Sequence, residues 1–268
     1  MKIFIDSADV WAIKDAYETG LIDGVTTNPT LIMKSGRHPE KVYQKLKDMG
    51  IGDISMEVVG NAETMINEGR RLKAKFGDCA TIKVPCTPDG LLACHTLSKE
   101  LIRVNVTLIF STAQAILAAK AGATYVSPFV GRLEDNSHSG VEVVRSIVDI
   151  YKKHGIYTEV LAASIRDVAK VTLAFWNGAH ICTIPPKVFT KMYDHVLTDA
   201  GLKIFDEDHK TTFSTERVGG DMDALGGSEM QYNFTDDGFT YTIDTPETQG
   251  IVDFGDMDPD DPRIGFIP

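Results

Sequence analysis

Hydrophobic positions in the first 200 residues switch repeatedly between a strand-like period of two and a helix-like period near four. Short β-rich runs alternate with longer amphipathic or alanine-rich stretches of helical length. We expect strands at Ile3–Asp6, Val25–Thr27, Ile54–Val59, Thr81–Val84, Val104–Thr107, Tyr125–Ser127, Tyr157–Leu161 and Ile181–Ile184. Helices are expected at Ser7–Thr19, Pro39–Met49, Ala62–Phe76, Pro88–Leu101, Ser111–Ala121, Val141–His154, Ile165–Phe175 and Lys187–Tyr193, with Ser7, Ser111 and Ser164 as N-caps.

Eight strand–helix units within about 200 residues favour a closed parallel barrel. An open doubly wound sheet is the competing arrangement, but no Gly-x-Gly-x-x-Gly follows the first strand. The expected fold class is therefore α/β, a (β/α)8 TIM barrel with an acidic C-terminal extension. In such a barrel, catalytic groups lie at the carboxyl ends of the strands.

The rhythm stops near residue 211, so we expect a barrel over residues 1–210 and an extension over 211–268. In the extension, apolar residues alternate with polar ones on both sides of an Asp-Gly turn at Thr235–Gly238. The apolar positions are Met230, Tyr232, Phe234, Phe239, Tyr241 and Ile243. This pattern predicts a β-hairpin, although part of the extension is equally compatible with disorder.

Charge is distributed unevenly along the 268 residues, whose net charge is −11. Residues 213–268 hold thirteen acidic residues and two arginines, so this segment carries the whole excess and the rest of the chain is balanced. Neither part suits nucleic acid or an anionic membrane surface. The first residues contain no apolar run long enough for a signal peptide, and the four cysteines are too few for a disulfide scaffold. We therefore expect a cytoplasmic protein.

Period-two parity places polar groups on one face of several expected strands. The opposite face of the same strands is apolar and suits packing under helices. The polar set would converge inside the mouth of a barrel; it comprises Asp6, Ser55, Glu57, Thr81, Lys83, Asn105 and Thr107.

Lys83 is the most informative member of this set, because burial disfavours the charged form of an amine and lowers its pKa. A neutral amine can attack a ketone and form a Schiff base. The alternatives are that Lys83 reaches out to solvent or forms a structural ion pair with Glu57 or Asp6. Taken alone, Asp6 suits a helix cap, and Asn28 suits a turn before Pro29.

Six stretches in this order resemble the transaldolase family, and most closely its short, single-barrel branch, which includes the fructose-6-phosphate aldolases. They are Phe4–Asp9, Gly24–Pro29, Ile82–Pro85, Asn105–Phe110, Ser127–Arg132 and Leu161–Arg166. The resemblance covers about residues 1–205 and implies a TIM barrel.

The resemblance also implies a role for each matching residue. Lys83 matches the Schiff-base lysine, and Asp6 the group that takes the proton from the substrate hydroxyl. Glu57 and Thr107 match the pair that positions a catalytic water. Substrate-binding matches are Asn28, Asn105 and Ser127 for the dihydroxyacetone hydroxyls, and Arg132, Ser164 and Arg166 for phosphate. Without the resemblance, the two arginines would be interpreted as ordinary surface residues.

Two positions separate activities within the family. The short aldolases have glutamine in place of Glu57 and tyrosine in place of Phe129, whereas this chain matches the transaldolases at both. A phenyl ring cannot protonate an enamine, so we expect transfer of a dihydroxyacetone unit between phosphorylated sugars in the pentose phosphate pathway. The alternatives are an aldolase that releases free dihydroxyacetone and, in another class, a non-catalytic barrel scaffold with an acidic binding tail. The resemblance further implies a homo-oligomer, a pentamer or decamer, and a reaction that needs no metal and no cofactor.

Overall fold

The computed structural model describes residues 1–215, 230–235 and 238–243. The chain divides into two compact units, Met1–Val196 and Leu197–Pro268. Helix α11 (Val196–Thr215) begins at this division and contains the boundary expected at residue 210.

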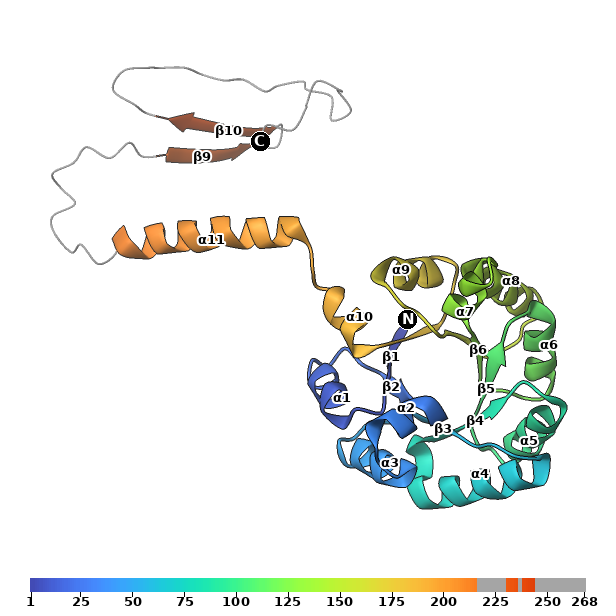
Figure 1. The fold of residues 1–268 in the computed structure, drawn as a ribbon. Helices are drawn as coiled ribbons and strands as arrows, with labels where there is room; N and C mark the ends of the chain where they lie inside the picture. Colours follow the sequence, from blue (N-terminus) through green and yellow to red (C-terminus); the bar gives the residue numbers. More distant parts are fainter. Residues whose placement is uncertain (216–229, 236–237, 244–268) are drawn as a thin grey trace. The chain divides into compact units, whose positions relative to one another are not determined.

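The first unit is a closed barrel of eight strands in sequential order, and every registered pair of neighbours is parallel. Figure 1 shows the strands enclosed by a ring of helices. The predicted (β/α)8 TIM barrel is confirmed. Its strands are β1 (Lys2–Asp6), β2 (Gly24–Thr26), β3 (Ile54–Glu57), β4 (Ala80–Pro85), β5 (Val104–Ile109), β6 (Tyr125–Pro128), β7 (Glu159–Ala162) and β8 (Ile181–Ile184).

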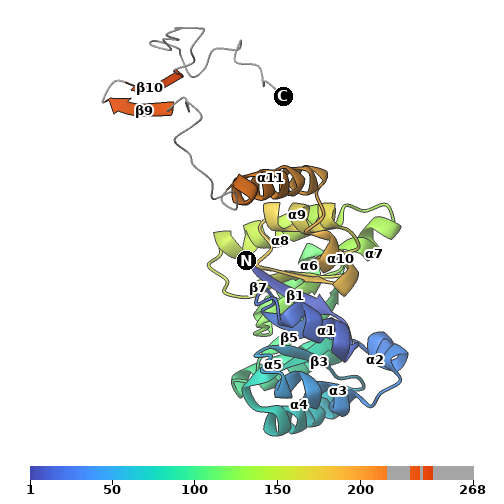
Figure 2. The same ribbon diagram turned by 90° about the vertical axis from the view of Figure 1, so that its left-hand side faces the viewer.

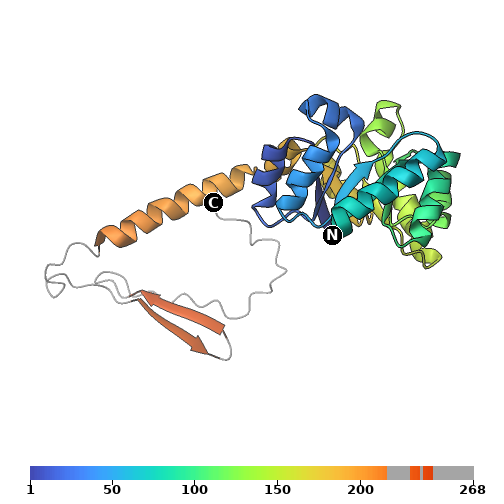
Figure 3. The ribbon, with the colours of Figure 1, turned by 90° about the horizontal axis from the view of Figure 1, so that it is seen from below.

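The helices on the outside match eight expected segments within a few residues at most ends. They are α1 (Val10–Tyr17), α3 (Pro39–Asp48), α4 (Ala62–Phe76), α5 (Pro88–Lys99), α6 (Thr112–Lys120), α8 (Gly140–Lys153), α9 (Val168–Trp176) and α10 (Pro186–Lys191). The sequence pattern did not predict α2 (Pro29–Ser35), α7 (Val130–Asp135) or α11. Helices α2 and α7 follow their strands almost directly and span only seven and six residues, which is less than the window over which a helical period is recognised. Of the short helices, the pattern marked only α10, which has six residues. Figures 2 and 3 show both of them at the end of the barrel away from the N terminus.

Two of the three expected N-caps are wrong. Ser111 caps α6 in a capping box with Gln114, as expected. Asp9, however, caps α1 by accepting from the backbone N–H of Trp11, and Asp167 caps α9. Asp6 and Ser164 therefore lie before their helices and keep their side chains available for the barrel mouth.

The strands present two different faces, as the period of two requires. Their outward side chains, such as Ile5, Ile82 and Val106, join the buried aliphatic core beneath the helices. The barrel interior holds a separate small apolar cluster of Phe4, Tyr125, Leu161, Ala163 and Ile181. Polar side chains lie above and below it, and so the parity expected from the sequence is confirmed.

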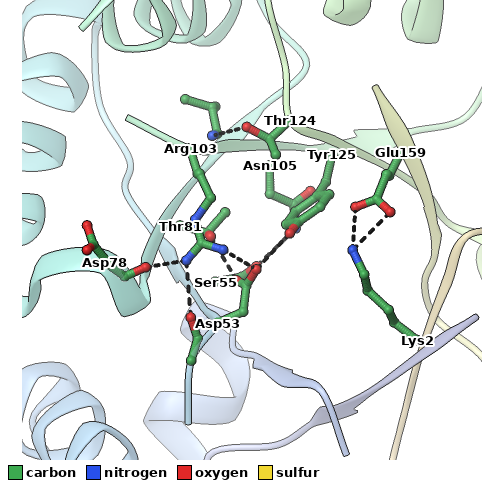
Figure 4. Close-up of polar contacts among 12 residues, drawn as sticks. Lys2, Asp53, Ser55, Asp78, Thr81, Arg103, Asn105, Thr124, Tyr125 and Glu159 are labelled. Carbon is green, nitrogen blue, oxygen red and sulfur yellow. Dashed lines mark hydrogen bonds and ion pairs between the residues drawn. The ribbon is translucent and has the colours of Figure 1, made fainter. Parts of the chain in front are cut away.

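Asp53 organises polar contacts around the amino ends of the strands (Figure 4). Its Oδ2 accepts from Arg103 Nη1 and from the Tyr125 hydroxyl, both at 2.7 Å. Its Oδ1 accepts from the Thr81 hydroxyl at 2.8 Å. We call these four residues the floor cluster. The expectation that Thr81 lies at the barrel mouth is therefore wrong, because Thr81 is near the start of β4 and points inward at the opposite end.

In the second unit, β9 (Met230–Thr235) and β10 (Gly238–Ile243) form the predicted antiparallel hairpin. The register pairs Phe239 with Phe234 and Tyr241 with Tyr232. The expected turn residues Asp236 and Asp237 lie outside the described residues. Among the helices of the described ranges, none combines the length and apolar character needed to span a membrane.

Candidate active site

A cavity of about 90 Å³ opens at the carboxyl ends of the barrel strands. It contains eight of the eleven predicted site residues. The lining residues are Asp6, Thr26, Asn28, Lys83, Thr107, Ser127, Phe129, Arg132, Leu161, Ala163, Ser164 and Thr183. Of the other three predicted residues, Glu57 and Asn105 contact lining side chains, and Arg166 lies beside the loop that contains Ser164.

Lys83 extends from β4 into this cavity and is 5% exposed. Its Nζ lies 3.0 Å from Glu57 Oε2 and donates to the backbone carbonyl of Thr27 at 2.9 Å. The side chain therefore does not reach out to solvent, and the ion pair with Glu57 considered from the sequence is present. A buried, hydrogen-bonded amine next to a carboxylate that can accept its proton has the arrangement required of a Schiff-base nucleophile.

Asp6 ends β1 on the same side of the barrel. Burial raises its carboxyl pKa, while the positive charge of Lys83 and the hydrogen bond from Thr26 act in the opposite direction. The Thr26 hydroxyl donates to Asp6 Oδ1 at 2.8 Å and lies 2.6 Å from the hydroxyl of Thr183. A carboxyl group with a raised pKa beside a cavity is suited to exchanging protons with a bound molecule.

Thr107 has a buried hydroxyl with no hydrogen-bond partner within the described part of the chain. The next residue, Leu108, has a φ of 58°, and the register of β5 against β6 shifts between Val106 and Ile109. This irregularity turns the strand where Thr107 lines the cavity. The Thr107 hydroxyl is therefore available to pair with a polar group that enters the cavity.

Asn105 and Ser127 form a hydrogen-bonded pair, and the contact of Asn105 with Ser55 determines which group donates. The Asn105 side-chain nitrogen donates to Ser55 Oγ at 3.2 Å, so its Oδ1 accepts from Ser127 Oγ at 2.7 Å (Asn105 and Ser55 are labelled in Figure 4). The Ser127 hydroxyl thus already donates its proton to Asn105, and its oxygen remains as an acceptor in the cavity. This arrangement suits a ligand hydroxyl as the donor.

Asn28 combines the two roles considered from the sequence. Its Oδ1 accepts from the backbone N–H of Leu31 at 2.9 Å and caps α2. Its side chain also lines the cavity, where the amide N–H groups remain as donors.

The two predicted phosphate-binding arginines have different surroundings. Arg132 lines the cavity with its guanidinium carbon 4.9 Å from the centre of the Phe129 ring. Arg166 donates from both terminal nitrogens to the carboxylate of Asp135, on helix α7. Ser164, with a φ of 59°, lies next to Arg166 in the loop after β7. Cationic and hydroxyl groups gathered at one side of a cavity are suited to a phosphate group.

Comparison with known proteins gives the family of this barrel. The profile of the transaldolase/fructose-6-phosphate aldolase family matches residues 3–236. A probable transaldolase from Caulobacter vibrioides is 51% identical over 213 residues, which is 79% of this chain and 98% of that relative. Probable transaldolases from Paracoccus denitrificans, 50% identical over 79% of this chain and 98% of the relative, and from Clostridium botulinum strain Hall, 49% identical over 81% and 100%, are similar.

This chain belongs to the transaldolase/fructose-6-phosphate aldolase family. It is an enzyme of the transaldolase/aldolase type, as the resemblance in its six motifs predicted.

Two polar residues that line this transaldolase-family site, Thr26 and Thr183, were not among the residues expected at the mouth, whereas Ser55 was expected there and is hydrogen-bonded to Asn105. Each lies on the inward face of its strand, so the parity rule that singled out Lys83 contains the signal for them. In the described ranges, no group of three His, Cys, Asp or Glu side chains is placed to hold a metal ion.

Proposed function

We propose that this protein is a transaldolase of the pentose phosphate pathway that acts through a Schiff base on Lys83. It would transfer a dihydroxyacetone unit from a ketose phosphate, sedoheptulose 7-phosphate or fructose 6-phosphate, to an aldose phosphate. The observation that carries this proposal is the buried Lys83 amine in a cavity shared with Asp6 and adjacent to Glu57.

In the first half of the reaction, the Lys83 amine must lose a proton before it attacks the C2 ketone. Glu57, 3.0 Å away, is placed to accept that proton. Loss of water from the resulting carbinolamine gives the iminium ion. The Thr107 hydroxyl lines the cavity and has no partner within the described ranges, which supports a role in holding the water that leaves and later returns.

In the cleavage step, Asp6 accepts the proton of the C4 hydroxyl while the bond between C3 and C4 breaks. The electron pair of that bond flows to the iminium nitrogen, which leaves an enamine on Lys83 and releases an aldehyde. The hydrogen bond from Thr26 to Asp6 fixes the orientation of the carboxylate. Addition of the enamine to the acceptor aldehyde reverses these transfers and returns the proton from Asp6.

The rest of the cavity would orient the sugar. Ser127 would accept from a hydroxyl of the dihydroxyacetone part, and the Asn28 amide would donate to its oxygens. Asn105, which is fully buried, would act by orienting the Ser127 hydroxyl. Arg132, Ser164 and Arg166 would bind the phosphate group of the donor and of the acceptor.

Reduction with borohydride in the presence of fructose 6-phosphate tests the covalent step. The adduct should form on Lys83, since reduction converts the Schiff base to a stable secondary amine; mass spectrometry of peptides locates it. Lys83→Ala should remain unlabelled, while Lys120→Ala, which changes an exposed lysine on α6, should label normally. Labelling of the Lys83→Ala protein would refute the assignment.

The alternative is a fructose-6-phosphate aldolase, which would release dihydroxyacetone without an acceptor. Phe129 supports transfer instead, because its ring has no proton to give to the enamine. Measuring cleavage of fructose 6-phosphate with and without erythrose 4-phosphate separates the two activities. Sustained turnover without the acceptor would favour the aldolase.

A non-catalytic scaffold with an acidic binding tail is the hypothesis from another class. Removing residues 216–268 tests it, because a transaldolase should keep its transfer activity while a tail-dependent binding protein should lose its function. The buried ionisable groups at the mouth favour the enzyme, since a scaffold gains nothing from desolvating them.

We further propose that the protein is a homo-oligomer, a pentamer or decamer, and works in the cytoplasm. Helix α11 exposes Leu202, Ile204 and Phe205, an apolar surface suited to a second copy. All four cysteines are free, which agrees with a reducing compartment. Sedimentation of the full chain should show the oligomer, and the double change Leu202→Lys and Phe205→Lys should reduce its size.

A further inference from the structure

Helix α7 and the loop after β7 approach each other closely beside the cavity. The backbone N–H of Val130 donates to the carbonyl of Ala163 at 3.0 Å, and that of Gly131 donates to the carbonyl of Ser164 at 3.1 Å. The Ala163 N–H in turn donates to the carbonyl of Pro128 at 2.9 Å. These three bonds join the two segments along the edge that carries both Ser164 and Arg132.

Gly131 is the point of closest approach. A Cβ atom at this position would lie 2.3 Å from the carbonyl oxygen of Ser164 and 2.8 Å from Nε of Arg166. Gly131 lies inside α7, so its backbone conformation does not require glycine. Space alone excludes a side chain, and the nearest obstacle is backbone, which cannot move aside by a change of rotamer.

The residues packed against Gly131 are Ser164 and Arg166, which are suited to binding phosphate. Ser164 is held at a φ of 59°, an unusual conformation that persists only where its surroundings impose it. Arg166 is restrained at both ends, with Nε beside Gly131 and its terminal nitrogens on Asp135, four residues further along α7. A single short helix thus fixes the serine and the arginine together.

We propose that Gly131 is a positioning residue that sets the phosphate subsite by letting α7 touch the loop after β7. The absence of a side chain places Ser164 and Arg166 where they meet the same phosphate group as Arg132. This inference rests on the proposed function, because it assumes that the cavity receives phosphorylated sugars.

Gly131→Ala in the full-length protein tests the inference. The added methyl group must displace Ser164 and the Arg166 guanidinium, so calorimetry should show inorganic phosphate binding weakened by about tenfold or more. The KM for fructose 6-phosphate should rise by a similar factor while kcat changes little. Borohydride trapping of unphosphorylated dihydroxyacetone on Lys83 should be unchanged, because Lys83 and its neighbours Glu57 and Thr27 lie on or after β4, β3 and β2, away from the contact that Gly131 makes.

Two further variants sharpen the test. Gly52→Ala is the matched control, since a Cβ there would meet no atom within 4 Å, and it should behave as the wild type. Gly140→Ala would displace the start of α7, because a Cβ at Gly140 would lie 2.5 Å from the Cα of Val130. It should weaken phosphate binding selectively too, to a smaller extent.

The inference is overturned if Gly131→Ala binds phosphate as tightly as the wild type. Loss of dihydroxyacetone trapping together with phosphate binding, or a variant that does not fold, would equally overturn it, because Gly131 would then support the whole barrel. Failure of the proposed function would give a different result, because the wild-type protein would then form no adduct with fructose 6-phosphate. Calorimetry would still measure whether Gly131→Ala weakens the binding of inorganic phosphate.

Discussion

The interior of the barrel contains two buried polar regions that differ in how their hydrogen-bonding groups are paired. In the floor cluster, Asp53 is 6% exposed and both of its oxygens accept hydrogen bonds, from Arg103, Tyr125 and Thr81. At the mouth, Thr107 has a buried hydroxyl without a partner among the described residues, and burial raises the pKa of Asp6.

This difference separates a structural polar network from a reactive one. A network whose donors and acceptors are all satisfied stabilises a single arrangement and offers nothing to a ligand. A network with an uncommitted donor or acceptor facing a cavity can instead pair with the polar groups of a substrate. We therefore expect changes at the floor to alter stability and changes at the mouth to alter chemistry.

The strongest test of the mouth is Lys83→Met. Methionine fills similar space but has no nucleophile, so transfer should fall to the uncatalysed background, about six orders of magnitude or more below the wild type. A coupled assay of erythrose 4-phosphate consumption measures the rate. Substantial residual transfer in a protein of normal melting temperature would break the comparison.

The matching test of the floor is Asp53→Ala. It leaves Arg103 and the Tyr125 hydroxyl without their buried acceptor, and the free energy of unfolding should fall by about 3–5 kcal/mol. KM for the donor should not change. As a control, Lys2→Ala breaks a more exposed ion pair with Glu159 and should cost about 1 kcal/mol or less in urea unfolding.

Phe129→Tyr would place a tyrosine hydroxyl in the cavity, which can be compared with the hydroxyl of Tyr125 in the floor cluster. The hydroxyl of Tyr125 is committed to Asp53, whereas a hydroxyl introduced at residue 129 would enter the cavity as a proton donor. It should speed release of dihydroxyacetone without an acceptor by up to about a hundredfold. Chromatographic measurement of free dihydroxyacetone checks this, and an unchanged release rate would mean that this position does not govern the fate of the enamine.

Asp6→Asn should impair cleavage, and its effect on the pH dependence of stability is the smallest effect expected in this comparison. The carboxyl pKa of Asp6 is raised in the folded protein, so the wild type loses stability as the pH rises from the ordinary aspartate range through that raised value. The amide does not titrate. The melting temperature of Asp6→Asn relative to the wild type should therefore be higher at pH 8 than at pH 4; a difference independent of pH would contradict the assigned burial cost.

The local pattern of apolar and polar residues made much of the barrel predictable. The alternation of side chains placed Asp6, Lys83 and Thr107 on inward faces, and short apolar runs marked all eight strands. The same reasoning missed the short helices α2 and α7, although it marked α10, which is as short as α7. It also assigned caps to Ser7 and Ser164 that Asp9 and Asp167 provide. It gave no reason to connect Arg166 with Asp135, which lies 31 residues away.

By itself, the sequence determined which side chains enter the barrel, because the period of a strand is a property of the local backbone. It also carried the motifs that define the family. Only the tertiary structure decided which of those side chains are satisfied, since Asp53 and Tyr125 are 72 residues apart and Lys83 and Thr27 are 56. Closing the barrel brings such partners together at some positions, whereas the Thr107 hydroxyl has no partner among the residues that the structure describes.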